Sequence, residues 1–366
     1  MKILYGVQGT GNGHIARSRA MCAALKQQHV EVDYLFSGRT AANYFSMECF
    51  GDFQTRQGLT FATENGHVNY VKTLRRNNLW QFWQDVRALD LSGYDLILND
   101  FEPVTAWAAK LQNVPCIGIS HQNAFLFPVP LKGASWIDKA ILRHFAPAQY
   151  HLGLHWYHFD QPILPPIIYT PEQPLCHQAF ILVYLPFENL NEICELLNRF
   201  TNVHFICYHP DVQGNEQTEN VQLCRLHHGD FQHHLHQCHG VVTSGGFELP
   251  SEALTLGKKL LMKPLLGQFE QLSNAATLET LGLASVMEFL DPASLRLWLD
   301  EKQAERVFYP DVAQALVEWI LQGKWESSSE LSLKLWQKVD FPSYAILGND
   351  STVSMNSPLK HFKREC

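Results

Sequence analysis

Two glycine-rich turns lie far apart in this chain of 366 residues, and each is followed by a residue type that could do chemistry. The first turn, residues 8–14 (QGTGNGH), ends in His14, and the second, residues 243–246 (TSGG), precedes a segment that carries Glu252. An imidazole titrates near neutral pH and can take the proton of an attacking hydroxyl. A helix that starts beside glycines presents free N–H groups and its positive dipole end to an anion. The two turns therefore predict a general base and a seat for a phosphorylated ligand.

The second turn and the residues after it suit a nucleotide sugar. Gly245 and Gly246 lack the Cβ atoms that would keep a diphosphate away, and a helix carboxylate such as Glu252 can accept two hydrogen bonds from a ribose diol. The side chains that offer donors and acceptors to sugar hydroxyls are Gln268, Glu270 and Gln271. A plainer interpretation also fits, in which the glycines only make a tight turn and Glu252 only complements a helix dipole.

Polar residues follow two predicted strands of the first half of the chain. Asp100 and Glu102 follow one strand, and His121 follows the next. The carboxyl ends of parallel strands line the cleft of an open α/β sheet. A carboxylate bonded to the far nitrogen of His14 would fix the tautomer of its ring. Asp100 is the candidate and Glu102 its competitor, because the spacing does not choose between them; His121 faces an acceptor or only caps a turn.

The first turn could also be taken for a dinucleotide fingerprint. In G-x-G-x-x-G, the third glycine allows close packing of helix and strand, and here that position is His14. The strand predicted over residues 30–36 ends in Ser37, Gly38 and Arg39, without the acidic residue that binds a ribose 2′-hydroxyl. The pattern therefore disfavours an NAD site.

Alternating short apolar runs and amphipathic segments predict an α/β fold with two doubly wound domains. The predicted domains are residues 1–165 and 176–322, separated by a proline-rich linker near residues 165–176, and residues 323–366 are predicted to be a loosely held tail. The predicted strands are residues 2–7, 30–36, 94–98, 114–119, 180–185, 203–208, 221–226, 240–242 and 259–262.

In its two turns the sequence resembles the GT-B glycosyltransferases. It is closest in pattern to the N-acetylglucosaminyltransferase that makes lipid II and to the UDP-glucuronosyltransferase branch. The resemblance rests on the loop that ends in Gly13-His14 and on the block TSGGFELPSEAL followed by GQFEQ. It implies two Rossmann-like domains that face a cleft, the first for the acceptor and the second for the donor.

The resemblance also implies a role for each matching residue. His14 would be the general base, oriented by Asp100, with Gly11, Gly13, Glu102 and His121 on the acceptor side. Ser244, Gly245, Gly246 and Phe247 would hold the diphosphate, Glu252 the ribose, and Gln268, Glu270 and Gln271 the sugar. The family often has Asp where this chain has Glu270, which leaves the sugar open. Leu226 and His227 are the positions nearest to the base.

The implied function is an inverting, metal-independent glycosyltransferase that moves a sugar from a nucleotide sugar, expected to be a UDP-sugar, to a hydroxyl of a cell-envelope or lipid-linked acceptor. No cofactor is expected, because the nucleotide sugar is a substrate, and no Asp-x-Asp metal motif occurs in the chain. Two alternatives stay open: a nonhydrolysing UDP-sugar epimerase, and a non-catalytic subunit that binds sugar nucleotides.

Composition limits the remaining classes. A formal charge of −8 argues against a nucleic-acid partner, and the nine cysteines include no Cys-x-x-Cys pair. The expected location is the cytoplasm, with peripheral contact to the inner face of the membrane if residues 135–143 form a basic amphipathic helix there. The histidines between residues 227 and 239 match no metal-site spacing, and a solvated helix face explains them better.

Overall fold

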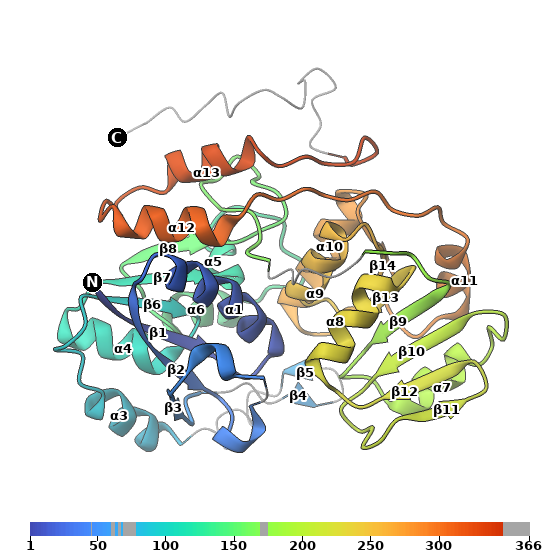
Figure 1. The fold of residues 1–366 in the computed structure, drawn as a ribbon, viewed down its shortest axis with the longest axis horizontal. Helices are drawn as coiled ribbons and strands as arrows, with labels where there is room; N and C mark the ends of the chain where they lie inside the picture. Colours follow the sequence, from blue (N-terminus) through green and yellow to red (C-terminus); the bar gives the residue numbers. More distant parts are fainter. Residues whose placement is uncertain (45, 60–62, 65–66, 69–77, 169–174, 347–366) are drawn as a thin grey trace.

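The computed structural model describes residues 1–44, 46–59, 63–64, 67–68, 78–168 and 175–346, which form two lobes (Figure 1). The first lobe is built on a six-stranded sheet in which all neighbouring strands are parallel. In sheet order its strands are β3 (Phe53–Arg56), β2 (Glu31–Ser37), β1 (Lys2–Gln8), β6 (Leu96–Asp100), β7 (Cys116–Ser120) and β8 (Tyr150–Gly153).

The helices of the first lobe lie in the connections between successive strands of this sheet, as a parallel topology requires. They are α1 (Asn12–Gln27), η1 (Ala41–Asn43), η2 (Glu48–Phe50), α3 (Leu79–Ala88), α4 (Pro103–Gln112), α5 (His121–Ala124) and α6 (Trp136–His144). A separate pair of very short strands, β4 (Thr63–Glu64) and β5 (His67–Val68), is antiparallel. Lys72, Arg75 and Arg76, basic residues that suit either the border of an acceptor site or, more simply, a solvated helix, lie outside the described residues.

The second lobe carries a seven-stranded sheet that is parallel except at β11. In sheet order its strands are β11 (Glu216–Thr218), β12 (Val221–Cys224), β10 (His204–Tyr208), β9 (Phe180–Tyr184), β13 (Gly240–Thr243), β14 (Lys259–Met262) and β15 (Ser285–Val286). Its helices are α7 (Leu190–Leu197), α8 (His228–Gln237), α9 (Glu248–Thr255), α10 (Phe269–Thr280) and α11 (Pro292–Leu299). The prediction of two doubly wound α/β units is confirmed.

After the second sheet the chain returns to the first lobe. Helix α12 (Val312–Leu321) packs on α1, and α13 (Ser329–Trp336) packs on α12 (Figure 1). Residues 323–346, predicted to belong to a loose tail, instead bury Leu331, Leu335 and Trp336, and the Trp336 indole donates to the carbonyl of Ile163. The prediction failed because α13 is a short helix, and its hydrogen bonds to the carbonyl of Ile163 join residues about half the chain apart. Residues 347–366 lie outside the described part.

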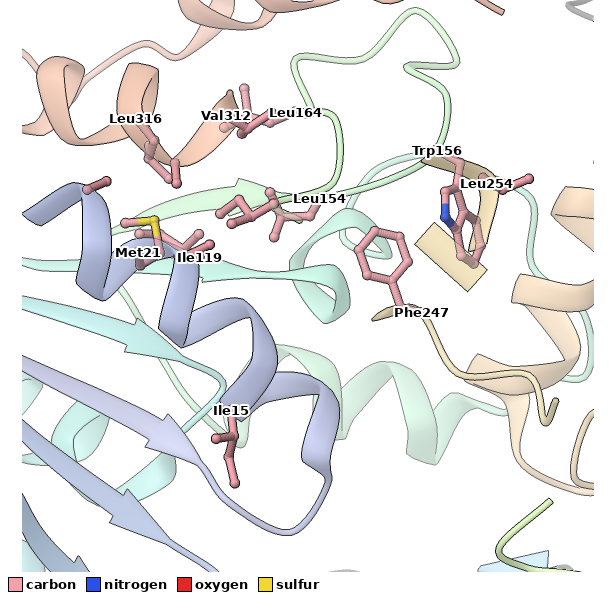
Figure 2. Close-up of a cluster of buried hydrophobic side chains, with 14 of the residues drawn as sticks. Ile15, Met21, Ile119, Leu154, Trp156, Leu164, Phe247, Leu254, Val312 and Leu316 are labelled. Carbon is pink, nitrogen blue, oxygen red and sulfur yellow. The ribbon is translucent and has the colours of Figure 1, made fainter. Parts of the chain in front are cut away.

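One apolar cluster runs through both lobes and fixes how they meet. Figure 2 shows Ile15 and Met21 of α1, Trp156 beyond β8, and Phe247 at the start of α9 in this cluster. The Trp156 side chain is fully buried, and its indole donates to the hydroxyl of Ser251 at 2.8 Å. Because this core crosses the lobe boundary, it holds the turn before α1 close to the turn before α9.

Candidate active site

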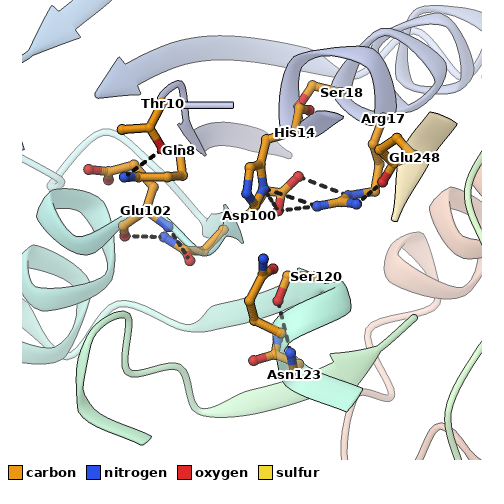
Figure 3. Close-up of polar contacts among 12 residues, drawn as sticks. Gln8, Thr10, His14, Arg17, Ser18, Asp100, Glu102, Ser120, Asn123 and Glu248 are labelled. Atoms are coloured by element: carbon orange, nitrogen blue, oxygen red, sulfur yellow. Dashed lines mark hydrogen bonds and ion pairs between the residues drawn. The ribbon is translucent and has the colours of Figure 1, made fainter. Parts of the chain in front are cut away.

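The first glycine-rich turn places His14 at the carboxyl edge of the first sheet. Gly11 is the N-cap of α1, so the helix starts at Asn12 and carries His14 in its first turn. Strands β1 and β6 pair in parallel with Val7 opposite Asp100, which brings the two strand ends together. His14 Nδ1 lies 2.8 Å from Asp100 Oδ1 (Figure 3). The ring nitrogen Nε2 has no partner among the described residues, so it is free to meet a substrate hydroxyl.

Asp100 is completely buried, and two further bonds hold it. Arg17 donates from Nε to Oδ2 at 2.9 Å and from Nη2 to Oδ1 at 2.7 Å. Burial opposes ionisation of Asp100, but the neighbouring Arg17 and His14 outweigh it and hold the pKa of the carboxyl below its usual value. The carboxylate is therefore charged and fixed in orientation, as the partner of a base must be.

Arg17 also reaches the second lobe, where it makes an ion pair with Glu248 of α9 (Figure 3). Arg17 and Glu248 are both buried. Burial raises the pKa of Glu248 to about 8, although the charge of Arg17 opposes this. Neither residue had a predicted role, because a sequence does not show that positions 17 and 248 meet.

The structure separates the two candidate partners of His14. Asp100 contacts the ring, whereas Glu102 caps α4: it accepts from the N–H groups of Val104 and Thr105 and from the Thr105 hydroxyl. Burial raises the pKa of Glu102. The carboxyl is completely enclosed, so the predicted acceptor-side role of Glu102 does not fit this structure.

His121 is also enclosed at the junction between the lobes. Its Nδ1 lies 2.8 Å from the Leu154 carbonyl and its Nε2 lies 2.7 Å from Asn274 Oδ1. The ring stacks on Phe247 with centroids 3.9 Å apart. Both ring nitrogens of His121 have partners, so His121 joins the lobes here. The alternative in which His121 faces an acceptor does not fit this structure.

Side chains of α10 hold the second glycine-rich turn in place by hydrogen bonds. Gln271 Oε1 accepts from the Gly245 N–H at 3.1 Å and from the Leu265 N–H at 2.9 Å, and Asn274 Nδ2 donates to the Gly245 carbonyl. A Cβ at Gly245 would lie 2.6 Å from the Gln271 carbonyl, so only glycine fits there. Gln271, predicted to contact the sugar, uses its carbonyl oxygen to shape the turn.

Two backbone N–H groups that follow in the same turn remain unpaired among the described residues. The N–H groups of Gly246 and Phe247 have no hydrogen-bond partner within the part of the chain that the structure describes, and no side chain caps α9. A Cβ at Gly246 would meet no atom within 4 Å. Unpaired N–H groups at a helix start favour an anion. The predicted diphosphate seat is therefore not filled by side chains.

A pocket between the lobes begins at this helix. It holds about 750 Å³ of empty space, part of it open to solvent, between α1 and the carboxyl edge of the second sheet. Glu252 lies on its wall and accepts a hydrogen bond from Gln232 at 3.0 Å. Burial raises the pKa of Glu252 to about 7, while Gln232 and Arg19 oppose this. The other lining residues are Asn12, Gly13, Ile15, Ala16, Arg19, Tyr184, Leu226, His227, His228, Phe231, Gln232, Glu248 and Leu249.

The remaining predicted sugar contacts lie at the start of α10. Gln268 is its N-cap residue, and Glu270 accepts from Gln122 Nε2 of the first lobe at 3.1 and 3.3 Å. Gln122 Oε1 is buried and has no partner among the described residues. The carboxylate of Glu270 is thus held at the junction, beside an acceptor atom that a hydroxyl could satisfy.

Arg39, after β2, is a further cation near the first turn that the sequence did not single out for binding. It donates to the Thr10 carbonyl at 2.8 Å, and no carboxylate of the described chain pairs with it. Burial lowers the pKa of Arg39, which shows that its charge is partly removed from water. Within the described residues, no three His, Cys, Asp or Glu side chains are placed to hold a metal ion.

Comparisons with solved structures agree with this architecture. The glycosyltransferase SnogD from Streptomyces nogalater matches 92% of this chain and 98% of its own at 16% identity and a TM-score of 0.55. The glycosyltransferase of kitacinnamycin matches 93% and 99% at 16% identity and a TM-score of 0.57. The spinosyn rhamnosyltransferase SpnG, complexed with thymidine diphosphate, matches 90% and 96% at 13% identity and a TM-score of 0.55. The fold is therefore that of the GT-B glycosyltransferases.

The sequence also matches the profile of a protein family. The profile described as glycosyl transferase family 1 matches residues 1–301, so the chain belongs to that family and is a glycosyltransferase. No curated protein matches the chain at a significant level.

Proposed function

We propose that this glycosyltransferase moves a sugar from a nucleoside diphosphate sugar to an acceptor hydroxyl, with inversion at the anomeric carbon and without a metal ion. The observation that carries the proposal is the 2.8 Å contact between His14 and buried Asp100. His14 directly follows Gly13, which lines the pocket together with Glu248 of the first turn of α9. A base on one side of the sugar and an anion seat on the other suit a single displacement.

In this reaction the acceptor O–H gives its proton to His14 Nε2, and the oxygen attacks the anomeric carbon. The bond from that carbon to the diphosphate breaks, and its electron pair leaves with the phosphate oxygen. Asp100 stabilises the imidazolium that forms. The N–H groups of Gly246 and Phe247 stabilise the negative charge on the leaving diphosphate.

The donor would lie along the pocket in three parts. Glu252 accepts from the ribose hydroxyls, and Leu226 and His227 border the base. Glu270, with Gln268, contacts the sugar. UDP remains the proposed carrier from the sequence resemblance, and the thymidine diphosphate in SpnG makes dTDP-sugars the second group to test.

The acceptor is proposed to be a cell-envelope or lipid-linked hydroxyl. Helix α6 supports this, because Trp136 is 79% exposed and Lys139 and Arg143 lie one and two turns further along. Within the described residues, no helix combines the length and apolar character that crossing a bilayer requires.

The test is release of free nucleotide from a panel of UDP-, GDP- and dTDP-sugars, with and without acceptor lipids. We expect one donor group to release nucleotide slowly, and His14→Ala to lower the rate by about 10²–10⁴-fold. His204→Ala, an exposed histidine of the second lobe, is the matched control. Release that does not depend on His14 would refute the base assignment. Epimer formation without release would indicate the isomerase, and binding without turnover the non-catalytic subunit.

A further inference from the structure

Arg17 is the centre of a buried polar cluster that joins the two lobes. Its guanidinium contacts both oxygens of Asp100, and the same group pairs with Glu248. Nη2 also lies 3.1 Å from His14 Nδ1. Figure 3 shows these four side chains in contact, with Arg17 between Asp100 and Glu248. The proposed reaction uses His14 and Asp100 and gives Arg17 and Glu248 no part.

The backbone of the first turn is shaped to receive Glu248. A Cβ at Gly13 would lie 2.9 Å from Glu248 Cγ, so a larger residue there would push α9 away. Helices α1 and α9 are packed against each other at this point. Gly13 therefore leaves room for the donor-binding helix α9 to pack against α1, and the side chain of Glu248 occupies this room.

Arg17 controls the orientation of Asp100. A carboxylate bonded to His14 alone would keep one oxygen unpaired in a fully buried site, which is costly. Two N–H donors of one planar guanidinium fix both oxygens, and hence the atom that His14 Nδ1 meets. The orientation of Arg17 in turn depends on Glu248, the carboxyl partner it has on the opposite lobe.

We propose that Arg17 is a positioning residue which, anchored by Glu248 of α9, holds the His14–Asp100 pair in its working orientation, so that the base is set only when the donor-binding helix is docked on α1. The inference rests on the proposed function for the role of His14. The anchoring itself is independent of the donor and acceptor.

The anchor does not need a negative charge on Glu248. Burial raises the pKa of this carboxyl to about 8, and a neutral carboxyl or amide oxygen also accepts a hydrogen bond from Arg17. Glu248→Gln should therefore preserve the arrangement, whereas Glu248→Ala should release Arg17. Arg17→Lys keeps the charge but cannot hold two carboxylate oxygens and Glu248 together.

The first readout is the low-field proton resonance of the His14 Nδ1–H, measured without substrate and assigned by its loss in His14→Ala. A ring that is held against Asp100 protects this proton from exchange with water. We expect the resonance to persist in Glu248→Gln and to broaden beyond detection in Glu248→Ala and Arg17→Lys. Ser273→Ala, which removes a different contact between the lobes, from the Lys132 N–H, is the matched control and should retain it.

The second readout is nucleotide release from UDP-N-acetylglucosamine and UDP-glucose. For Glu248→Ala and Arg17→Lys we expect kcat to fall by about 10–100-fold with a KM change below about 3-fold, since orientation is lost but the proposed donor contacts at Gly246, Phe247 and Glu252 remain. Glu248→Gln should keep at least about half of the wild-type kcat, because it keeps the hydrogen bond.

The outcomes separate this inference from the function. If neither UDP-sugar is turned over but the resonance follows the expected order, the anchoring stands and the proposed activity fails. A folded Glu248→Ala or Arg17→Lys that keeps both the resonance and kcat would overturn the inference. So would equal losses in Glu248→Gln and Glu248→Ala, because the conservative variant would then not rescue.

Discussion

The two glycine-rich turns follow the same strand–turn–helix pattern, yet their surroundings complete them differently. At the first turn, His14 is held by Asp100, and Arg17 holds both oxygens of that carboxylate. At the second turn, the N–H groups of Gly246 and Phe247 have no partner in the described chain. In the proposed function, the first turn is preorganised for proton transfer before any ligand arrives, and the second is completed only when an anion binds.

The buried carboxyl groups near the two turns also differ in how fully the protein itself supplies their hydrogen-bond donors. Asp100 is buried, but its partners keep its pKa below the usual value. Glu252 is buried with one amide partner, and burial raises its pKa to about 7. Because the free protein supplies Glu252 with only this one described hydrogen-bond donor, its carboxyl can accept further hydrogen bonds from a ligand, such as the hydroxyls of a ribose.

Asp100→Asn should have the largest effect, because it reverses the hydrogen bond to His14. The new amide can donate to Nδ1, which would leave the proton on Nε2 and prevent that atom from accepting one. We expect kcat for sugar transfer to fall by about 10²–10⁴-fold with little change in donor KM. Asp211→Asn, at an exposed carboxylate, is the control. A loss that appeared mainly in KM would mean that Asp100 serves binding.

Gly246→Val tests the second glycine-rich turn. A Cβ at Gly246 meets open space, so the fold should be unaffected, but the side chain would occupy the proposed diphosphate seat. We expect KM for the donor to rise by about 10–100-fold, the equivalent of losing one or two charge-assisted hydrogen bonds, with thermal stability nearly unchanged. Unchanged donor affinity in a folded variant would place the diphosphate elsewhere.

Local patterns explain which parts of the sequence could be interpreted correctly. The two turns, most strands and the ends that carry Asp100 and His121 follow from short stretches whose meaning is local. Contacts between distant residues were not accessible. The pairing of Arg17 with Glu248 spans 231 positions, and no periodicity reports it.

Side-chain roles within a correctly placed motif were also hard to assign. The amide of Gln271 suits sugar hydroxyls and predicts a sugar contact, yet its oxygen accepts from the Gly245 N–H and holds the turn. Glu102 was a plausible acidic neighbour of His14, yet it caps α4. In each case the choice depends on backbone N–H groups that the sequence does not locate.

The contrast between the carboxyl groups predicts a pH dependence of stability. The folded pKa of Glu252, about 7, exceeds that of an unfolded glutamate, so the folded protein binds this proton more tightly. The resulting stability is fully present below the unfolded pKa and is lost as pH rises through about 7. Asp100, with a lowered pKa, has the opposite sign, and its contribution is lost in acid.

We therefore expect the contribution of Glu252 to the free energy of unfolding of the ligand-free protein to decrease between pH 5 and pH 8, against the opposite contribution of histidines whose pKa burial lowers, such as His121 and His155. Glu252→Gln should reduce this decrease by up to about 3 kcal/mol, at roughly 1.4 kcal/mol per pKa unit. Urea titrations across this pH range measure the slope. Saturating UDP should also flatten it, because ribose hydroxyls would favour the carboxylate. An identical slope in the variant would show that Glu252 does not titrate there.

The smallest expected effect concerns Gln122, where the lobes meet beside the proposed sugar site. Its Nε2 holds Glu270, while its buried Oε1 has no partner in the described chain and can accept from a sugar hydroxyl. Gln122→Met keeps the volume and removes both contacts. We expect donor KM to rise by about 2–10-fold, the equivalent of 0.5–1.5 kcal/mol, with kcat nearly constant. Ser273→Ala, which removes a neighbouring contact between the lobes, should leave KM unchanged. A lower KM in Gln122→Met would mean that Gln122 competes with the sugar for Glu270, and the sign of the change decides between the two roles.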